Sequence, residues 1–195
     1  TLYSPMLKKY RHFPAGISLA ELLEYMLAQS DNNAADILLE YAGGAKEVEE
    51  YLKTIGFKEI TIAVNEREMN ADIEKQLLNK AYPLDVARVM QKAFDGNILP
   101  SYQKDFLKQV LLKTTTGNDK IKAGLPPQTV IGHKTGSSSR RENGVKIADN
   151  DAGFVVLPDG RKYYIVVMLS DSKMSDEKNA GLIAGISSVV YAHLL

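Results

Sequence analysis

The sequence contains no cysteine, which excludes disulfide bonds, thiolate metal sites and a cysteine nucleophile. Histidine is scarce as well, with three residues far apart in the chain, and no HExxH pattern places two of them one helical turn apart. The composition therefore gives no indication of a metal site, and we expect no cofactor.

The chain also has no net charge and no long apolar run. Its 24 basic side chains equal its 24 acidic ones, so nothing favours a phosphate backbone or anionic lipid as a partner. The most apolar stretch, residues 180–195, is too short to span a bilayer and is interrupted by serine and histidine. We therefore expect a small-molecule substrate, and neither nucleic acid nor a membrane, as the partner.

The remaining composition is an ordinary globular balance, with 45% apolar and 25% charged residues, and the 195 residues predict one domain, or two interleaved sub-domains that share a core. Helical spacing dominates its first part. Ser18 followed by Glu21 forms a capping-box pattern before an apolar helix that ends near Ser30. Further helices are expected over about 32–42, 48–55, 83–95 and 106–111.

From about Thr61 to Tyr82 the helical pattern disappears, and charged and amide side chains dominate. A loop of this length inside a compact domain is usually functional. The sequence therefore predicts a long irregular loop with a functional role.

The hydrophobic period changes near Thr129. Runs of β-branched and apolar residues predict strands at 129–135, 151–157 and 162–170, with a hairpin turn at Pro158-Asp159-Gly160 between the last two. A closing helix is expected over about 176–194. We therefore predict an α+β fold in one domain over residues 1–195. Its part from about 16 to 125 is mainly helical, and its part from about 126 to 195 is an antiparallel sheet covered by the C-terminal helix.

Three short motifs follow one another: Ser30-Asp31-Asn32, then Glu66-Arg67-Glu68-Met69-Asn70, then Lys134-Thr135-Gly136. Each alone has an ordinary explanation, as helix caps, a solvated loop charge and an exposed strand lysine respectively. The first motif lies between two predicted helices, the second on the long loop and the third on the first predicted strand. This order and these positions together favour a catalytic origin. We interpret His133 differently, because strand alternation points it behind the sheet, away from Lys134.

With these motifs in this order, the chain resembles the class A serine β-lactamases, whose signatures include two of them. The resemblance extends over essentially the whole chain. The Gly43-Gly44 pair, residues 114–117 and residues 150–153 are most similar to the cephalosporinase branch with an enlarged omega loop. The resemblance implies a β-lactamase/transpeptidase-like fold, hydrolysis of β-lactams through an acyl-enzyme, and a periplasmic or secreted location.

The resemblance also implies roles for individual residues. Ser30 would relay a proton to the leaving nitrogen, Glu66 would be the general base for the deacylating water, and Lys134 would raise the local positive potential. The implied substrate-binding residues are Asn32, Asn70, Thr135, Gly136, Ser137 and Lys122. Among them, the hydroxyls of Thr135 and Ser137 would bind the substrate carboxylate, and the Ser137 N–H would supply half of an oxyanion hole. We expect the motifs to converge on one cleft.

Two departures from the family pattern stand out. No Ser-x-x-Lys motif, which carries the family's nucleophile, precedes Ser30, and we interpret the three later matches, at 101–104, 170–173 and 175–178, as chance. We therefore expect an N-terminal truncation and an inactive 195-residue chain. In addition, Ala152 stands where many members carry arginine. Lys122 would replace that cation for the substrate carboxylate, with Arg140 and Arg141 as competitors.

Other functions compete with hydrolysis. A penicillin-binding D,D-peptidase shares the nucleophilic serine and the Lys-Thr-Gly motif. Glu66 and Asn70 argue against this alternative, because they serve deacylation. A non-catalytic β-lactam sensor is a second alternative. In a truncated chain the strand at 162–170 would form a sheet edge, and the closing-helix face with Val189 and Val190 would lose its cover. We expect that edge to pair with a second copy, with residues 1 to 15, or with a separate N-terminal fragment.

Overall fold

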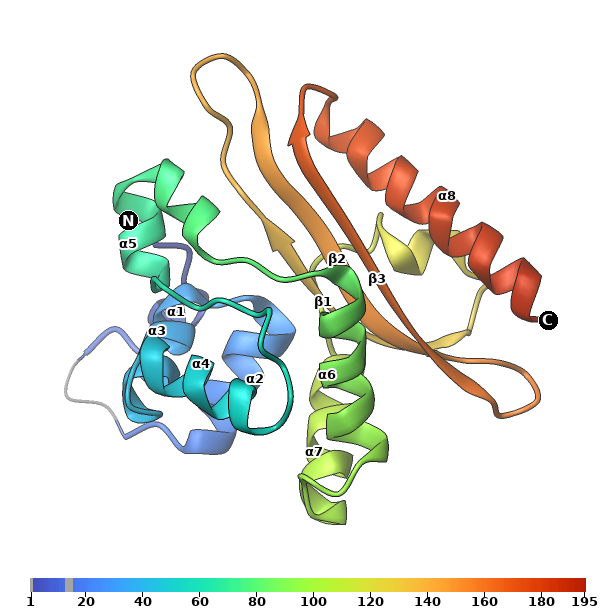
Figure 1. The fold of residues 1–195 in the computed structure, drawn as a ribbon, viewed down its shortest axis with the longest axis horizontal. Helices are drawn as coiled ribbons and strands as arrows, with labels where there is room; N and C mark the ends of the chain where they lie inside the picture. The colour runs from blue at the N-terminus through green and yellow to red at the C-terminus, as the bar shows by residue number, and fades with distance from the viewer. Residues whose placement is uncertain (1, 13–15) are drawn as a thin grey trace. The chain divides into compact units, whose positions relative to one another are not determined.

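The computed structural model describes residues 2–12 and 16–195 (Figure 1). The contacts divide the chain into two compact units, residues 1–85 and 86–195. The second unit includes the helix at 101–112, which the sequence pattern alone groups with the helical part. That the two units together form a single domain stays a prediction.

The first unit is helical, as predicted. Its helices are α1 (Met6–Lys9), α2 (Leu19–Gln29), α3 (Asn32–Tyr41), α4 (Ala45–Thr54), α5 (Glu66–Ala71) and the 3-10 helix η1 (Ile73–Leu78). The Ser18 side chain accepts a hydrogen bond from the Glu21 N–H and so begins α2 where the sequence places it. Met6, Tyr25 and Ala34 form the buried core on which α1, α2 and α3 pack.

The stretch from Thr61 to Tyr82 is not irregular throughout, and in this respect the prediction is wrong. Asn65 and Glu68 form a reciprocal capping box that begins α5, and Asp72 accepts from the Glu74 N–H at the start of η1. These helices arise from their caps rather than from apolar periodicity, which is why the hydrophobic pattern gave no sign of them.

The second unit contains the sheet. Its elements are α6 (Pro83–Asp95, which begins in the first unit), α7 (Ser101–Leu112), the 3-10 helix η2 (Ile121–Gly124), the strands β1 (Val130–Ser137), β2 (Lys146–Val156) and β3 (Lys162–Ser172), and α8 (Asp176–Leu194). The strands are antiparallel in the order β1-β2-β3. The predicted α+β arrangement, with the C-terminal helix on the sheet, is confirmed (Figure 1).

Alternation along β2 divides the second unit's core between the two faces of the sheet. Val155 lies in the cluster that joins the sheet to η2 and α8, together with Ile121, Ile165 and Ile183. The next side chain, Phe154, points to the other face, where its ring meets Phe94 of α6 edge-on at 5.1 Å. Burial of both faces fixes the register of the strands.

The second strand begins earlier than predicted, at Lys146 rather than at 151. Asp149 and Asn150, which lie before the predicted strand, pair with β1 and β3 as Asp151 does, and the carboxylates of Asp149 and Asp151 are buried. Both carboxylates have cationic or hydrogen-bonding partners, so the strand tolerates these two charges in its interior. The hairpin turn at 158–160 is confirmed.

Among the described residues β3 is a sheet edge, as predicted. The alternative in which residues 1 to 15 pair with it is wrong for the described residues 2–12, because Met6 is buried in the first unit and the Tyr3 carbonyl accepts from the Asn32 N–H. Val189 on α8 is 71% exposed, whereas Val190, expected to lose its cover, packs against the core. Within 2–12 and 16–195, no helix combines the length and apolarity needed to cross a membrane.

Candidate active site

The Ser30-Asp31-Asn32 motif joins α2 to α3. Asp31, only 1% exposed, fixes this corner: one carboxylate oxygen accepts from the Ser4 hydroxyl at 2.8 Å and the Met6 N–H at 2.7 Å, and the other accepts from the Ala34 N–H at 2.9 Å. Three donors on one buried carboxylate leave it little freedom. The position of Asp31 is therefore fixed, and Ser30 and Asn32 are its direct neighbours in the chain.

Ser30 itself has a left-handed backbone conformation, with φ 55° and ψ 41°, at the C-cap of α2. Glycine is the residue that normally takes this position, because a side chain there costs about 1–2 kcal/mol. A serine that served only to end the helix would carry this cost without benefit. The geometry therefore favours a role for the half-buried Ser30 side chain beyond capping.

Glu66 is the first residue of α5 and is half-buried. The carboxylate of Asp36, one helical turn after Asn32 on α3, accepts from the Glu66 N–H at 2.7 Å and from the Arg67 N–H at 3.1 Å. A carboxylate at the first N–H groups of a helix satisfies donors that have no intrahelical partner. The first unit thus places Glu66 one hydrogen bond away from the helix that Asn32 begins.

Asn79 holds the backbone that leads to Glu66. Its side-chain oxygen accepts from the Ala63 N–H at 2.8 Å and the Val64 N–H at 3.1 Å, and its amide donates to the Val64 carbonyl at 3.0 Å. Asn70, near the end of α5, is exposed. Asp36 and Asn79 therefore position Glu66 from either side. Neither residue is predictable from the sequence, since a single carboxylate or amide on a helix or loop carries no pattern.

The third motif lies on β1 in the second unit. Lys134 is half-buried and donates to the Thr135 carbonyl, Thr135 is buried, and Gly136 and Ser137 are exposed at the end of the strand. His133 is 2% exposed on the other side of the strand, with Nδ1 3.0 Å from the Asp151 carboxylate. The expectation that His133 hydrogen-bonds behind the sheet is confirmed.

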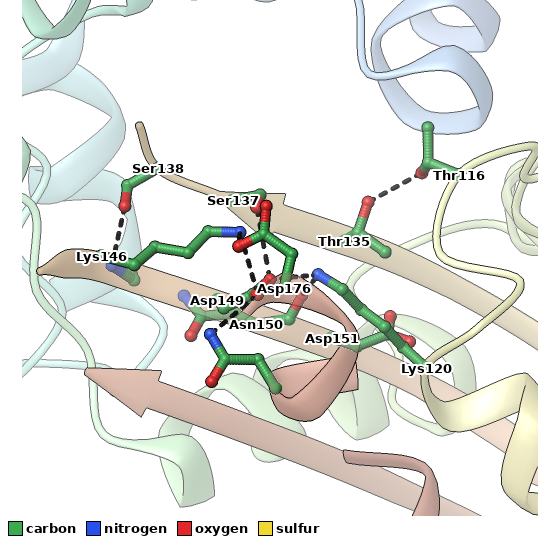
Figure 2. A network of polar contacts seen from close by, with 12 residues as sticks. Thr116, Lys120, Thr135, Ser137, Ser138, Lys146, Asp149, Asn150, Asp151 and Asp176 are labelled. Carbon is green, nitrogen blue, oxygen red and sulfur yellow. Dashed lines mark hydrogen bonds and ion pairs between the residues drawn. The ribbon is translucent and has the colours of Figure 1, made fainter. Parts of the chain in front are cut away.

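A buried ionic network lies beside this motif (Figure 2). The Asp149 carboxylate, 2% exposed, accepts from the Lys120 ammonium at 2.5 Å through one oxygen and from the Lys146 ammonium at 3.0 Å through the other. The Ser137 hydroxyl and the Asn179 amide each approach the same carboxylate at 3.3 Å. Asp149 thereby ties the end of β1, the 3-10 segment and α8 to β2.

The charges in this network determine the ionisation of Asp149. Burial raises the pKa of the carboxyl, but the hydrogen bonds and charges of Lys120 and Lys146 outweigh it, so the pKa lies below its ordinary value. Asp149 is therefore ionised at neutral pH. Two ammonium groups and one carboxylate give this group of three a net positive charge. The exposed carboxylate of Asp176, 3.1 Å from the Lys146 ammonium, offsets it.

The cations that the sequence proposed for a substrate carboxylate have partners elsewhere. Lys122 is exposed and donates to the Asn118 side chain at 3.0 Å. Arg140 binds the Met174 carbonyl and Asp176, and Arg141 binds Asp171. Lys120, which belongs to no sequence motif, contacts Asp149, the β2 residue that pairs with Ser137, as Lys146 also does. Only the early start of β2 reveals this, because it brings Asp149 opposite Ser137.

Within each unit, the structure brings the predicted residues together. Ser30, Asn32, Glu66 and Asn70 lie in the first unit around α3 and α5, and the Lys134-Thr135-Gly136 motif lies in the second with Ser137. That the two sets face one cleft stays a prediction. In residues 2–12 and 16–195, no three histidine, aspartate or glutamate side chains are placed to hold a metal ion.

Comparison with known proteins extends this picture. The sequence profile described as "Beta-lactamase enzyme family" matches residues 1–194. A "Beta-lactamase" of Bacteroides uniformis is 45% identical over 190 residues, which cover 97% of this chain and 64% of that protein. The "Extended-spectrum beta-lactamase PER-1" of Pseudomonas aeruginosa is 33% identical over 97% of this chain and 61% of its own length. The chain thus spans less than two thirds of these relatives.

Solved structures agree with the sequence comparison. A class A beta-lactamase from Bacteroides cellulosilyticus has 45% sequence identity and a TM-score of 0.96, with 100% of this chain and 70% of that chain covered. The extended-spectrum beta-lactamase TLA-1 gives a TM-score of 0.97 at 34% identity, with the same coverage.

Proposed function

Since this chain belongs to the beta-lactamase enzyme family and to its class A serine branch, we propose that the protein carrying it hydrolyses β-lactams through an acyl-enzyme. The observation that carries the proposal is the attachment of Glu66. The Asp36 carboxylate holds its N–H on the helix that Asn32 begins, and Ser30 keeps a side chain at a backbone position suited to glycine.

The proposed reaction has two stages. The serine of a Ser-x-x-Lys segment attacks the lactam carbonyl, the C–N bond breaks, and the Ser30 hydroxyl passes a proton to the leaving nitrogen. Glu66 then takes a proton from a water that attacks the ester, and Asn70 is the second group on that water. Asn32 orients the acylamide side chain of the substrate. Residues 1–29 contain no Ser-x-x-Lys pattern. In this proposal Ser30, Glu66 and Asn70 therefore act on a nucleophile from outside that stretch.

The second motif set binds the other end of the substrate in this proposal. Lys134 attracts its carboxylate and lowers the cost of proton transfer through Ser30. The hydroxyls of Thr135 and Ser137 donate to the carboxylate, Lys122 supplies a further cation, and the backbone at Gly136 and Ser137 offers an N–H to the oxyanion.

Nitrocefin turnover tests the proposal. The complete protein should hydrolyse nitrocefin, and Glu66→Gln should still acylate but accumulate an adduct that mass spectrometry detects. A polypeptide limited to residues 1–195 should not turn nitrocefin over, because the hydroxyl relay and the general base act as a unit with the nucleophile. A stable adduct in the unmodified protein, without turnover, would instead favour a D,D-peptidase or a sensor.

Location and self-association belong to the same proposal. A periplasmic or secreted enzyme meets β-lactams where they act, and the family resemblance supports that location. We also propose that the open edge of β3 pairs with a strand of a second copy or of a separate fragment. Its run from Tyr163 to Leu169 is apolar and β-branched without a charge, and such an edge offers unpaired backbone groups to another strand.

A further inference from the structure

Residues 114–121, here called the strap, connect α7 to η2 and are attached to the sheet at four points. The Thr114 hydroxyl donates to the His133 carbonyl, and the hydroxyls of Thr116 and Thr135 are 2.7 Å apart. The last two points are the Lys120 ammonium on Asp149 and the Ile121 N–H on Asp151, at 2.5 Å and 3.1 Å. Contacts to both β1 and β2 hold the strap against the sheet near Thr135.

Gly117 makes this close approach possible. Its φ is +67°, and a Cβ added to it would lie 2.3 Å from the Thr135 methyl carbon. Any side chain at this position would therefore push the strap away from Thr135. The hydroxyl of Thr116, the residue before Gly117, points toward the Thr135 hydroxyl (Figure 2).

Either of the two hydroxyls can be the donor in their contact. Each hydroxyl has one proton to donate, and a contact of 2.7 Å uses one of the two. When Thr116 donates, Thr135 accepts and its own proton stays available for an anion. That polarity forms a chain of hydrogen bonds in which each bond strengthens the next.

We propose that Thr116 is a positioning residue that directs the Thr135 hydroxyl proton toward the carboxylate of the substrate. The inference rests on the proposed function and concerns only the half of the site that binds the carboxylate. Thr116 acts through Thr135. Its loss should therefore weaken binding of a substrate that has a carboxylate and leave one without it unaffected.

The test compares a cephalosporin with its C4 methyl ester in the complete protein. Thr116→Val keeps the shape and removes the hydroxyl. It should raise KM for the acid about fivefold, the effect of one net hydrogen bond, with kcat nearly unchanged and the ester unaffected. Thr116→Ser should restore the wild-type KM. The matched control is Thr129→Val, whose hydroxyl donates only to the Pro126 carbonyl at 2.8 Å, and its KM should equal that of the wild type.

The outcomes separate the inference from the proposed function. Equal losses for acid and ester, or no change in Thr116→Val, would overturn the positioning role while hydrolysis itself stands. If the wild-type protein hydrolyses neither compound, the proposed function fails, and titration calorimetry with the same two compounds decides the inference. Weaker binding of the acid alone to Thr116→Val supports it, and any other calorimetric result overturns it.

Discussion

Replacement of Asp149 by asparagine should destabilise the protein far more than a surface substitution would. Asp149→Asn keeps the size of the side chain but removes the charge that Lys120 and Lys146 share. Lys146 retains Asp176 at 3.1 Å, whereas Lys120, 8% exposed, retains the Asn150 carbonyl at 3.3 Å. A buried charge left without its partner costs about 3–5 kcal/mol. With about 2.1 cal/mol/K of unfolding entropy per residue, the 195 residues should lose about 7–12 °C in Tm.

Urea unfolding followed by far-UV circular dichroism measures this loss, and Asp176→Asn is the matched control. The Asp176 side chain binds two cations as well, Lys146 and Arg140, but it is 69% exposed, so its loss should cost less than about 1 kcal/mol. Because the folded-state pKa of Asp149 is lowered, its contribution is complete above its unfolded value of about 3.9 and disappears as the pH falls through the folded value.

The stability curves of wild type and Asp149→Asn should therefore converge as the pH falls from 5 toward 2. Similar small losses for Asp149→Asn and Asp176→Asn at pH 7 would refute the reasoning. A gap that stays constant down to pH 2 would refute it equally, because the gap would then not come from the charge of Asp149.

Three further predictions concern the backbone and the sheet edge. Ser30→Gly should leave the free energy of unfolding unchanged or raise it by up to about 1 kcal/mol. Nitrocefin turnover by the complete protein should fall at least about a hundredfold. A loss of both stability and turnover would identify Ser30 as mainly structural. Gly124→Ala should cost more than about 2 kcal/mol in urea unfolding, because its Cβ would lie 2.0 Å from the Ala184 carbonyl oxygen, whereas Gly181→Ala, with nothing within 4 Å, should stabilise α8 by about 1 kcal/mol. Light scattering of the 195-residue chain should show association, with slow amide exchange in β3, and a stable monomer with fast-exchanging β3 amides would contradict it.

The helices with an apolar period and the hairpin could be predicted because their signals are local, whereas α5 and η1 begin at polar caps and show no such period. The Ser18 cap and the turn at 158–160 act within a few residues, and the structure places them where the pattern does. The motif residues were also found from the sequence, since their order along the chain matches a family pattern. Their placement in space was available only from that resemblance.

What the sequence could not reveal depends on distant partners. Nothing local places Asp149 in a strand, and nothing local predicts that Asp149 and Asp151 are buried among two lysines, a histidine and a backbone N–H. Asp36 is an ordinary helix aspartate until α5 begins against it. Lys120 differs from Lys122 only in the neighbours that the fold supplies. None of these contacts leaves a periodic trace, so no reading of local patterns finds them.

The anchoring of Glu66 through Asp36 has a consequence for how this region can change. Asn32 and Asp36 are four residues apart on α3, a rise of about 6 Å. The helix therefore fixes the spacing between Asn32, assigned to the substrate side chain, and the point where Asp36 holds Glu66, assigned to water. Insertions and deletions in the connections on either side of α5 do not change this spacing along α3. These connections can therefore change in length while the spacing between the two assigned groups is kept.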